Sequence, residues 1–213
     1  MGTETIIKDF KTERNQMVET QIAARGTCDP TVLAAMRVVP REAFMPESAV
    51  PFAYGDEALA IAEGQTISQP YIVALMTEAV APKPGDRALE IGTDSGYAAV
   101  VLAHIVSAVY TVERLAGLAE SAARRLAALG YENVHVRCSD GTLGWPEHAP
   151  YDAIIVTAGG PRVRRRFSTS SPLVDVSSCL SVRRRASNAS CGSSEPPRTH
   201  TRTSGSRKSP SCL

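Results

Sequence analysis

Residues 83–158 alternate between short apolar segments and amphipathic segments, and this alternation constrains the fold more than any other feature of the chain. The apolar and β-branched segments predict four strands, over 88–91, 108–113, 133–140 and 151–158. Helices are predicted between the first three strands, over 97–106 and 115–130, and a loop precedes the fourth strand. Strands that alternate with helices favour a doubly wound, mostly parallel α/β sheet.

The first 80 residues predict a helical extension in front of this sheet. Apolar residues recur at helical spacing in 4–25, 31–39 and 71–80, and the stretch GQTISQP between them is expected to be a polar loop. We therefore divide the chain into an N-terminal helical and loop extension (1–80), an α/β core (81–161) and a tail (162–213).

The composition excludes several classes of protein. No run approaches the roughly 18–20 apolar residues of a membrane span, and the charged start MGTETIIKDFKTERNQ lacks the apolar region of a secretory signal. The five cysteines have neither CxxC nor zinc-ligand spacing, so we expect reduced thiols, no metal site and a cytoplasmic location.

Candidate ligand-binding residues follow three of the predicted strands. LEIGTDSGY joins the first strand to a helix through a glycine-containing turn, where backbone N–H groups are free to meet a ligand. Glu113 ends the next strand and can accept both hydroxyls of a ribose, and Asp140 ends the third strand and can accept an adenine amino group. Open α/β sheets bind ligands at these carboxyl ends, so a nucleoside-containing cofactor is expected.

The turn departs from the dinucleotide-binding fingerprint. GTDSG lacks the GxGxxG spacing, which disfavours NAD, whereas an acid-x-G-x-x-x-G turn followed by a ribose-binding acid is closer to S-adenosylmethionine methyltransferases. The expected cofactor-binding residues are Glu90, Gly92, Thr93, Asp94, Ser95, Gly96, Glu113, Asp140 and Gly141.

Residues from about 14 to 161 resemble the protein-L-isoaspartate O-methyltransferase family, most specifically in GQTISQP and DGTLGWPEHAPYDAIIVTA. The resemblance implies a Rossmann-like methyltransferase with an N-terminal substrate-side extension and S-adenosyl-L-methionine as cofactor. It also implies a cytoplasmic, monomeric repair enzyme that methylates the free carboxylate of isoaspartyl residues in damaged proteins and peptides. Neither nucleic acid nor membrane is an expected partner.

The resemblance also assigns the acceptor side of the site. Ser68 matches the family's active-site serine and is expected to orient the substrate carboxylate by a hydrogen bond, while Thr66, Ile67 and Gln69 shape the slot around it. A carboxylate is already ionised at neutral pH, so positioning rather than a strong base provides most of the acceleration.

Two residues depart from the family pattern. Asp94 stands where the family usually has glycine, and its side chain places a negative charge close to the cofactor's carboxylate. Ser139 stands where glycine usually precedes the Asp-Gly pair. We expect weaker cofactor binding from Asp94 and a milder effect from Ser139.

After Pro161 the composition changes abruptly. Residues 162–213 contain fourteen serines, ten arginines and one lysine but only two acidic residues, Asp175 and Glu195, so their net charge is +9. This composition predicts a disordered tail. With suitable codons, a one-base shift turns residues 166–182 into ALLDQLAPGGRLVMPVG, which resembles the segment that the family has here. Our hypothesis is a frameshift around residues 162–166, and sequencing the DNA there tests it.

This hypothesis has a structural consequence. A sheet without its final strands leaves the edge of 151–158 uncovered, which predicts a marginally stable chain with weak or no activity. Two alternatives remain at this stage. One is an S-adenosylmethionine methyltransferase with a small-molecule acceptor, and the other is a non-catalytic protein that binds nucleic acid through the basic tail.

Overall fold

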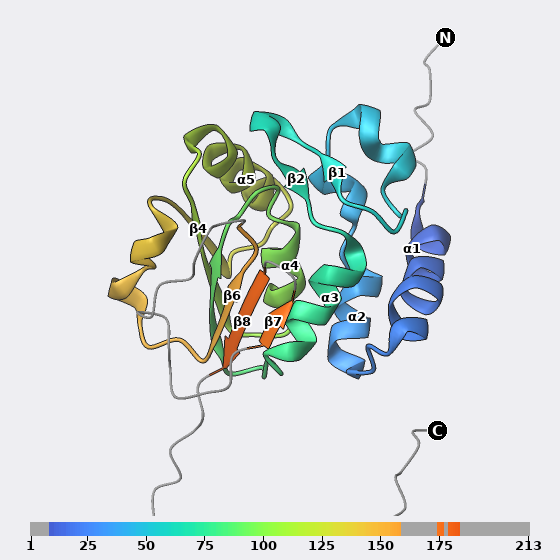
Figure 1. The fold of residues 1–213 in the computed structure, drawn as a ribbon. Coiled ribbons are helices and arrows are strands. Elements are labelled where there is room, and N and C mark those ends of the chain that lie inside the picture. Colours follow the sequence, from blue (N-terminus) through green and yellow to red (C-terminus); the bar gives the residue numbers. More distant parts are fainter. Residues whose placement is uncertain (1–8, 159–173, 177–178, 184–213) are drawn as a thin grey trace, which may run out of the picture.

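A six-stranded sheet forms the centre of the molecule, with the strand order β5-β4-β3-β6-β8-β7 (Figure 1). The computed structural model describes residues 9–158, 174–176 and 179–183. The strands are β3 (Arg87–Ile91), β4 (Ala108–Glu113), β5 (Val134–Cys138), β6 (Ala153–Val156), β7 (Val174–Val176) and β8 (Cys179–Arg183). Neighbours among β5, β4, β3 and β6 are parallel, so the predicted doubly wound sheet is confirmed.

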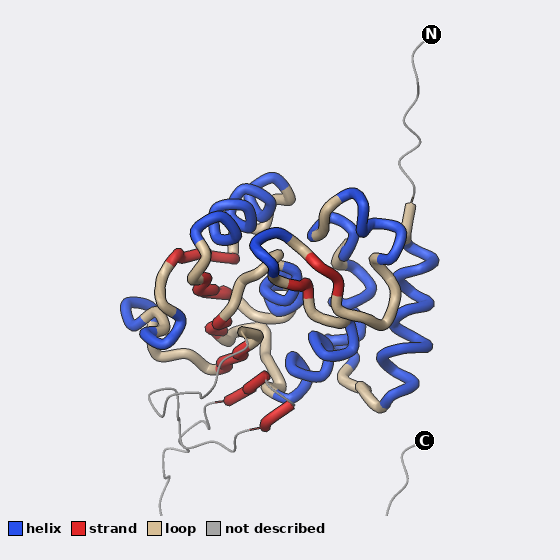
Figure 2. Tube along the Cα trace, turned by 45° about the horizontal axis from the view of Figure 1, so that its top comes forward, coloured by secondary structure: helices blue, strands red, loops and turns tan. Residues whose placement is uncertain are grey.

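The helices of the extension lie together on one side of the sheet, as Figure 2 shows after a turn of the molecule. They are α1 (Lys11–Met17), α2 (Pro30–Val38) and α3 (Pro70–Ala79), and the core adds α4 (Tyr97–Ala103) and α5 (Ala116–Ala128). α1 continues into the π-helix η1 (Val18–Ile22), and shorter 3₁₀ segments include η3 (Arg41–Phe44), η6 (Gly141–Leu143) and η7 (Pro146–His148). No helix of the described residues is both long enough and apolar enough to cross a membrane.

Local sequence signals explain where the helices begin. Asp29 caps α2: its carboxylate accepts the backbone N–H groups of Thr31 and Val32, and Pro30 occupies the first helical position. These bonds, together with one from the Thr31 hydroxyl, lower the pKa of Asp29 from its ordinary value. Because a proline at this position has no N–H to leave unpaired, the sequence DPTVLAAM begins a helix at low cost.

The two faces of the sheet pack into separate hydrophobic clusters. Ala88, Val109, Ala153 and Ile155 face the larger cluster, which also contains buried residues of α2, α3 and α4. The alternate residues of the same strands, among them Leu89, Val112 and Ile154, face a smaller cluster with Tyr151 and, beside it, Trp145. This alternation is the period of two that strands impose on side chains.

The direction of the chain reverses between β3 and β6. From β3 the chain moves outward through β4 to β5 and then returns to place β6 on the other side of β3. Parallel α/β sheets bind ligands at such a reversal, outside the carboxyl ends of the strands. The fold therefore points to the ends of β3 and β6 as the site.

The prediction that the edge of the fourth strand, now β6, is uncovered is wrong. β8 pairs antiparallel with β6 along its length, from Ala153 opposite Arg183 to Val156 opposite Leu180, and β7 pairs with β8. In the sequence of β8, Leu180 and Val182 alternate with Ser181 and Arg183, which is the period of two that a strand shows, and the overall composition of the tail hid this signal. The expectation of disorder for 162–173, 177–178 and 184–213 concerns residues outside the described ones.

Candidate functional site

A cavity lies where β3 and β6 end, and it brings the GTDSG turn next to the GQTISQP segment. Residues from the extension, from β3 and its following turn, from α4 and from the end of β6 line it. They are Ile67, Ser68, Val73, Glu90, Gly92, Thr93, Asp94, Ser95, Tyr97, Ala98 and Thr157. Two segments that the sequence identified separately thus share one cavity.

The GTDSG turn, which follows β3, has an unusual backbone conformation. Gly92 has φ of 100°, Asp94 has φ of 47° and Gly96 has φ of 88°, so the turn enters the left-handed region three times. Thr157 at the end of β6 donates its hydroxyl to the carbonyl of Gly92 at 2.6 Å. This hydrogen bond connects the GTDSG turn after β3 to the end of β6, the strand on the other side of β3 from β4.

Glu90 is a buried carboxyl group at the floor of this cavity. Its Oε2 accepts the Thr111 hydroxyl at 2.6 Å, and the hydroxyls of Thr111 and Thr93 are also hydrogen-bonded. Within the described residues its Oε1 has no hydrogen-bond partner. Burial, with a smaller contribution from the neighbouring carboxyl groups of Asp94 and Glu113, raises the pKa of Glu90 to about 8 against the lowering effect of the Thr111 hydrogen bond.

Asp94 and Glu113 extend this acidic region. Glu113 accepts the backbone N–H of Asp94 through Oε2 at 3.1 Å and that of Leu115 through Oε1 at 2.9 Å. Burial, and next the charge of Glu113, raise the pKa of Asp94 to about 6. Each carboxylate oxygen can accept a further hydrogen bond, so Glu113 keeps the capacity for ribose hydroxyls.

The acidic cavity fits a positively charged ligand. A buried carboxyl group with an unpartnered oxygen is costly unless a cation or donor completes it. S-adenosylmethionine carries an ammonium group and a sulfonium group, and the cavity offers the unpartnered oxygen of Glu90 to such a group. The residues present are therefore compatible with the cofactor that the sequence predicted.

Asp140 and Gly141 lie beside the cavity rather than in its lining. Asp140 is exposed, caps η6 and accepts the backbone N–H of Thr142 at 2.8 Å. A Cβ on Gly141 would come within 2.5 Å of Cγ2 of Ile91, so this position needs glycine for close packing against the end of β3. Both residues follow β5, where the sequence placed them.

The GQTISQP segment is more ordered than the predicted loop. β1 (Leu59–Ala60) and β2 (Thr66–Ile67) form a small antiparallel pair, in which Thr66 and Ile67 of this segment lie opposite Ala60 and Leu59. Ile67 is buried and Ser68 is half-buried, and both line the cavity, whereas Thr66 is exposed and outside the lining.

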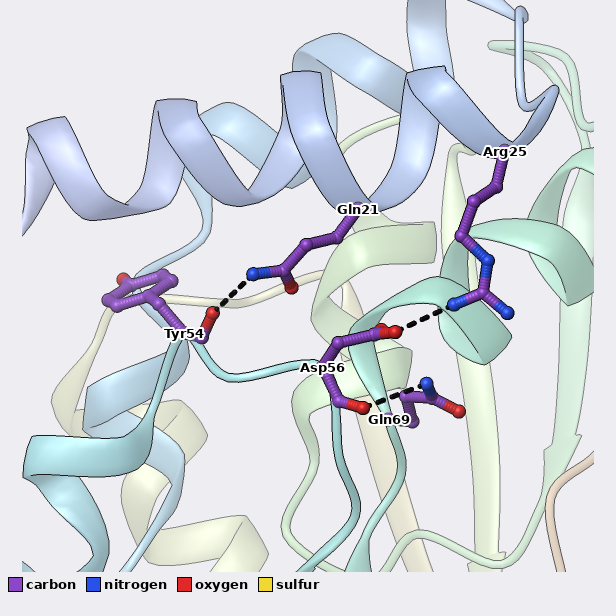
Figure 3. Close-up of polar contacts among 5 residues, drawn as sticks. All are labelled: Gln21, Arg25, Tyr54, Asp56 and Gln69. Atoms are coloured by element: carbon purple, nitrogen blue, oxygen red, sulfur yellow. Dashed lines mark hydrogen bonds and ion pairs between the residues drawn. The ribbon is translucent and has the colours of Figure 1, made fainter.

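Gln69 connects this segment to the loop before it. Figure 3 shows its side-chain amide pointing to the carbonyl of Asp56, with an N–O distance of 2.9 Å. The Asp56 carboxylate forms an ion pair with Arg25 at 2.7 Å, and Gln21 donates to the carbonyl of Tyr54. The loop over 54–56 is thus held between the N-terminal helices and the cavity segment.

Besides the apolar lining residues Val73 and Ala98, three polar residues at the site were not predicted from the sequence. Tyr97 and Thr157 line the cavity, and Arg125 of α5 donates to the carbonyl of Ser95, another lining residue, at 2.8 Å. Thr157 could have been found, since it is a polar residue near the carboxyl end of the fourth predicted strand, 151–158. The contact of Arg125 depends on how α5 packs, which the sequence does not reveal.

Replacing Asp94 with glycine is expected to tighten cofactor binding about tenfold. The change removes a half-buried carboxyl group near Glu113 and the left-handed strain of a residue with a Cβ. Calorimetry with S-adenosylhomocysteine measures the affinity, and Asp94→Asn, which removes only the charge, is expected to give an intermediate value. Equal or weaker binding by Asp94→Gly would show that the acid does not impair the site.

The comparisons with known proteins agree with the geometry. The family model described as protein-L-isoaspartate(D-aspartate) O-methyltransferase (PCMT) matches residues 12–170, which extends past Pro161, where the resemblance was expected to stop. The protein-L-isoaspartate O-methyltransferase 1 of Geotalea uraniireducens is 61% identical over 155 residues, which cover 73% of this chain and 71% of the relative. That of Rhodopseudomonas palustris CGA009 is 63% identical over 147 residues, which cover 69% and 67%.

Solved structures support the same fold. A protein-L-isoaspartate O-methyltransferase with 35% identity superposes with a TM-score of 0.64, over 70% of this chain and 49% of that chain. A β-aspartate methyltransferase (PCMT) from Plasmodium falciparum, solved with S-adenosyl-L-homocysteine, has 25% identity and a TM-score of 0.60, over 71% and 76%. This chain therefore covers about half of the first of these structures.

The match to the family model extends across the helical extension and the four parallel strands and includes both segments that meet at the cavity. The described residues thus combine the family's sequence, its fold and an acidic cavity at the place where the sheet reverses direction. The chain belongs to the protein-L-isoaspartate O-methyltransferase family of S-adenosylmethionine-dependent methyltransferases.

Proposed function

We propose that this chain transfers a methyl group from S-adenosylmethionine to the free carboxylate of L-isoaspartyl residues in damaged proteins and peptides. The observation that carries the proposal is that Ser68 and the GTDSG turn line one cavity. A residue suited to hold an acceptor and a turn suited to hold the cofactor are thus brought together from segments more than twenty residues apart.

The chemistry requires positioning more than proton transfer. When bound, S-adenosylmethionine would supply a methyl group on a positively charged sulfur: the carboxylate oxygen would form a bond to the methyl carbon as the carbon–sulfur bond breaks, and S-adenosylhomocysteine would leave. The acceptor is already ionised at neutral pH, so no residue has to remove a proton. Ser68 would donate its hydroxyl to the acceptor carboxylate and hold one oxygen toward the cavity, and Ile67 would exclude water beside it.

The cofactor side uses the residues at the ends of the parallel strands. We assign Glu90, Thr93, Asp94 and Ser95, with the backbone of Gly92 and Gly96, to the cofactor's charged end. Glu113 would accept the ribose hydroxyls and Asp140 with Gly141 would contact the adenine. Thr66 and Gln69 support the acceptor slot from the outer side, since Gln69 holds the loop at Asp56.

The wider setting follows from the same proposal. Residues 1–80 would provide the substrate side, residues 81–161 the cofactor side, and the protein would act as a monomer in the cytoplasm. Two alternatives are a methyltransferase with a small-molecule acceptor and binding of nucleic acid through the basic tail.

A methyl-transfer assay with labelled S-adenosylmethionine tests the function. We expect an isoaspartyl peptide to be labelled and the matched aspartyl peptide to remain unlabelled. Labelling would also show that the sequence after Pro161 is compatible with activity. Transfer to small molecules without transfer to the isoaspartyl peptide would favour the first alternative. Folded protein that transfers no methyl group but binds DNA with a steep salt dependence would favour the second.

Replacing Ser68 with alanine is expected to lower kcat/KM for the isoaspartyl peptide by about 10–100-fold. This is the usual range for losing one hydrogen bond to a charged group. Steady-state kinetics checks the loss, and Ser107→Ala is the matched control because Ser107 donates to the Asp86 carbonyl at the far end of β4. If both variants keep full activity, Ser68 does not hold the acceptor.

A further inference from the structure

Arg41, at the start of η3, is the largest fully buried side chain of the described residues, with an exposed fraction of 0%. Removing a guanidinium group from water is costly unless the protein supplies opposite charges or hydrogen-bond acceptors. The nature of its partners therefore determines whether Arg41 is neutralised by a carboxylate or leaves a net positive charge inside the protein.

Neutral carbonyl groups surround the guanidinium of Arg41. Nε donates to Ala53 at 2.8 Å, Nη1 to Ser68 at 2.7 Å and Nη2 to Glu57 at 3.2 Å, in each case to the backbone oxygen. Among the residues that the structure describes, no carboxylate forms an ion pair with Arg41. Burial lowers the pKa of Arg41, but a guanidinium remains charged at neutral pH, so the positive charge persists.

This charge lies directly behind the wall of the cavity. Two of the lining residues contact the guanidinium: Ser68 through its carbonyl, and Tyr97 through its ring, whose centroid is 5.2 Å from Cζ of Arg41. Phe44, from the same 3₁₀ helix, packs edge-on against the Tyr97 ring at 5.7 Å. The position of Arg41 relative to the cavity is therefore set by packing as well as by hydrogen bonds.

The acidic and basic groups around the cavity are unevenly distributed. Glu90, Asp94 and Glu113 lie on the side of the GTDSG turn, while Arg41 lies behind Ser68. Arg125 is a second cation, and it binds the carbonyl of Ser95 on the acidic side. The acidic side suits a cationic cofactor, and the side of Ser68 suits an anionic acceptor.

We propose that Arg41 is a positioning residue that selects a negatively charged acceptor, through its buried charge behind Ser68 and its hold on the Ser68 carbonyl. The inference rests on the proposed function, since it concerns the acceptor side of that site. The planar guanidinium group with its several N–H donors is needed to hold the Ser68 carbonyl together with the two other carbonyls, because one ammonium group cannot reach all three with the same geometry. The charge matters because it attracts a carboxylate but not a neutral amide of the same shape.

Direct binding separates this role from a merely structural one. The protein is saturated with S-adenosylhomocysteine and titrated by calorimetry with an isoaspartyl peptide, and then with the same peptide whose free carboxylate is a carboxamide. For the wild-type protein we expect the carboxylate peptide to bind about tenfold more tightly than the carboxamide peptide. This estimate uses Coulomb's law for the guanidinium and the carboxylate with Ser68 between them, at an effective dielectric constant of about 20. Arg41→Met is expected to bring this ratio close to one, and Arg41→Lys, which keeps the charge but not the three hydrogen bonds, to give an intermediate ratio.

Arg124→Met is the control, because it removes the charge of an exposed arginine that pairs with Glu120 on α5. It is expected to keep the wild-type ratio. If Arg41→Met binds S-adenosylhomocysteine normally and keeps the wild-type ratio, the inference is overturned. A wild-type protein that methylates no isoaspartyl peptide would instead overturn the proposed function.

A salt titration of the wild-type protein tests the inference without any variant, which matters if Arg41→Met does not fold. A buried charge is screened little by salt, whereas attraction by surface charges falls steeply. We expect the carboxylate-to-amide ratio to stay within about twofold between roughly 0.1 and 0.5 M NaCl. A ratio that collapses over this range would assign the preference to surface charges and overturn the role of Arg41.

Discussion

Replacing Gly92 with alanine is expected to lower the free energy of unfolding by about 3 kcal/mol and to abolish cofactor binding. Gly92 has φ of 100°, which strains any residue with a side chain. A Cβ at this position would also lie 2.7 Å from Oγ1 of Thr157 and 2.8 Å from the backbone nitrogen of Ala158. The backbone nitrogen cannot move without disturbing the end of β6, so the turn itself has to shift.

Gly130→Ala is the matched control for this substitution. Gly130 ends α5 with φ of 78°, but nothing lies within 4 Å of the Cβ that alanine would add. The control therefore measures the cost of the backbone conformation alone, about 1 kcal/mol. Urea unfolding gives both values, and calorimetry with S-adenosylhomocysteine gives the affinity. Equal losses in the two variants would mean that the close approach at Gly92 does not contribute.

The stability of the free protein is expected to fall by about 2 kcal/mol between pH 6.5 and 8, and Glu90→Gln is expected to remove this fall. Burial raises the pKa of Glu90 to about 8, from an ordinary value of 4.5. Between these values the folded state holds a proton that the unfolded state has released, so stability decreases as the pH rises. A glutamine has no proton to lose and occupies the same space.

The pH interval is chosen to separate Glu90 from Asp94. The pKa of Asp94 is raised to about 6, so its own contribution is largely lost before pH 6.5. Urea unfolding of both proteins across the interval measures the difference in slope. Glu120→Gln, at an exposed position of α5, is the control and is expected to keep the wild-type slope. A wild-type slope in Glu90→Gln would show that another group titrates.

Much of the fold could be predicted because it depends on local patterns. The strand over 108–113 coincides with β4, and the helices α2, α3 and α5 begin within one residue of their predicted starts. Strands and helices differ in the period of their apolar residues, so alternating segments define a parallel sheet before any contact is known. The pairing of β8 with β6 was missed because the charge of the surrounding tail outweighed a short strand signal.

The candidate site was only partly predictable. The acidic and glycine residues after β3, β4 and β5 could be placed at one edge, because carboxyl ends of parallel strands meet there. The unpartnered oxygen of Glu90, however, depends on how Thr111, which is itself hydrogen-bonded to Thr93, satisfies the other oxygen.

The alternation of the four parallel strands with helices, the glycine turn after β3 and the family follow from the sequence alone, because these depend on residue type and spacing along the chain. That Ser68 shares a cavity with Asp94, and that Arg41 is buried behind it, is visible only in the folded chain. Arg41 meets carbonyl groups from positions 53, 57 and 68, up to 27 residues away. Such contacts arise from packing between distant segments, and neither charge nor periodicity in the sequence reveals which side chain they enclose.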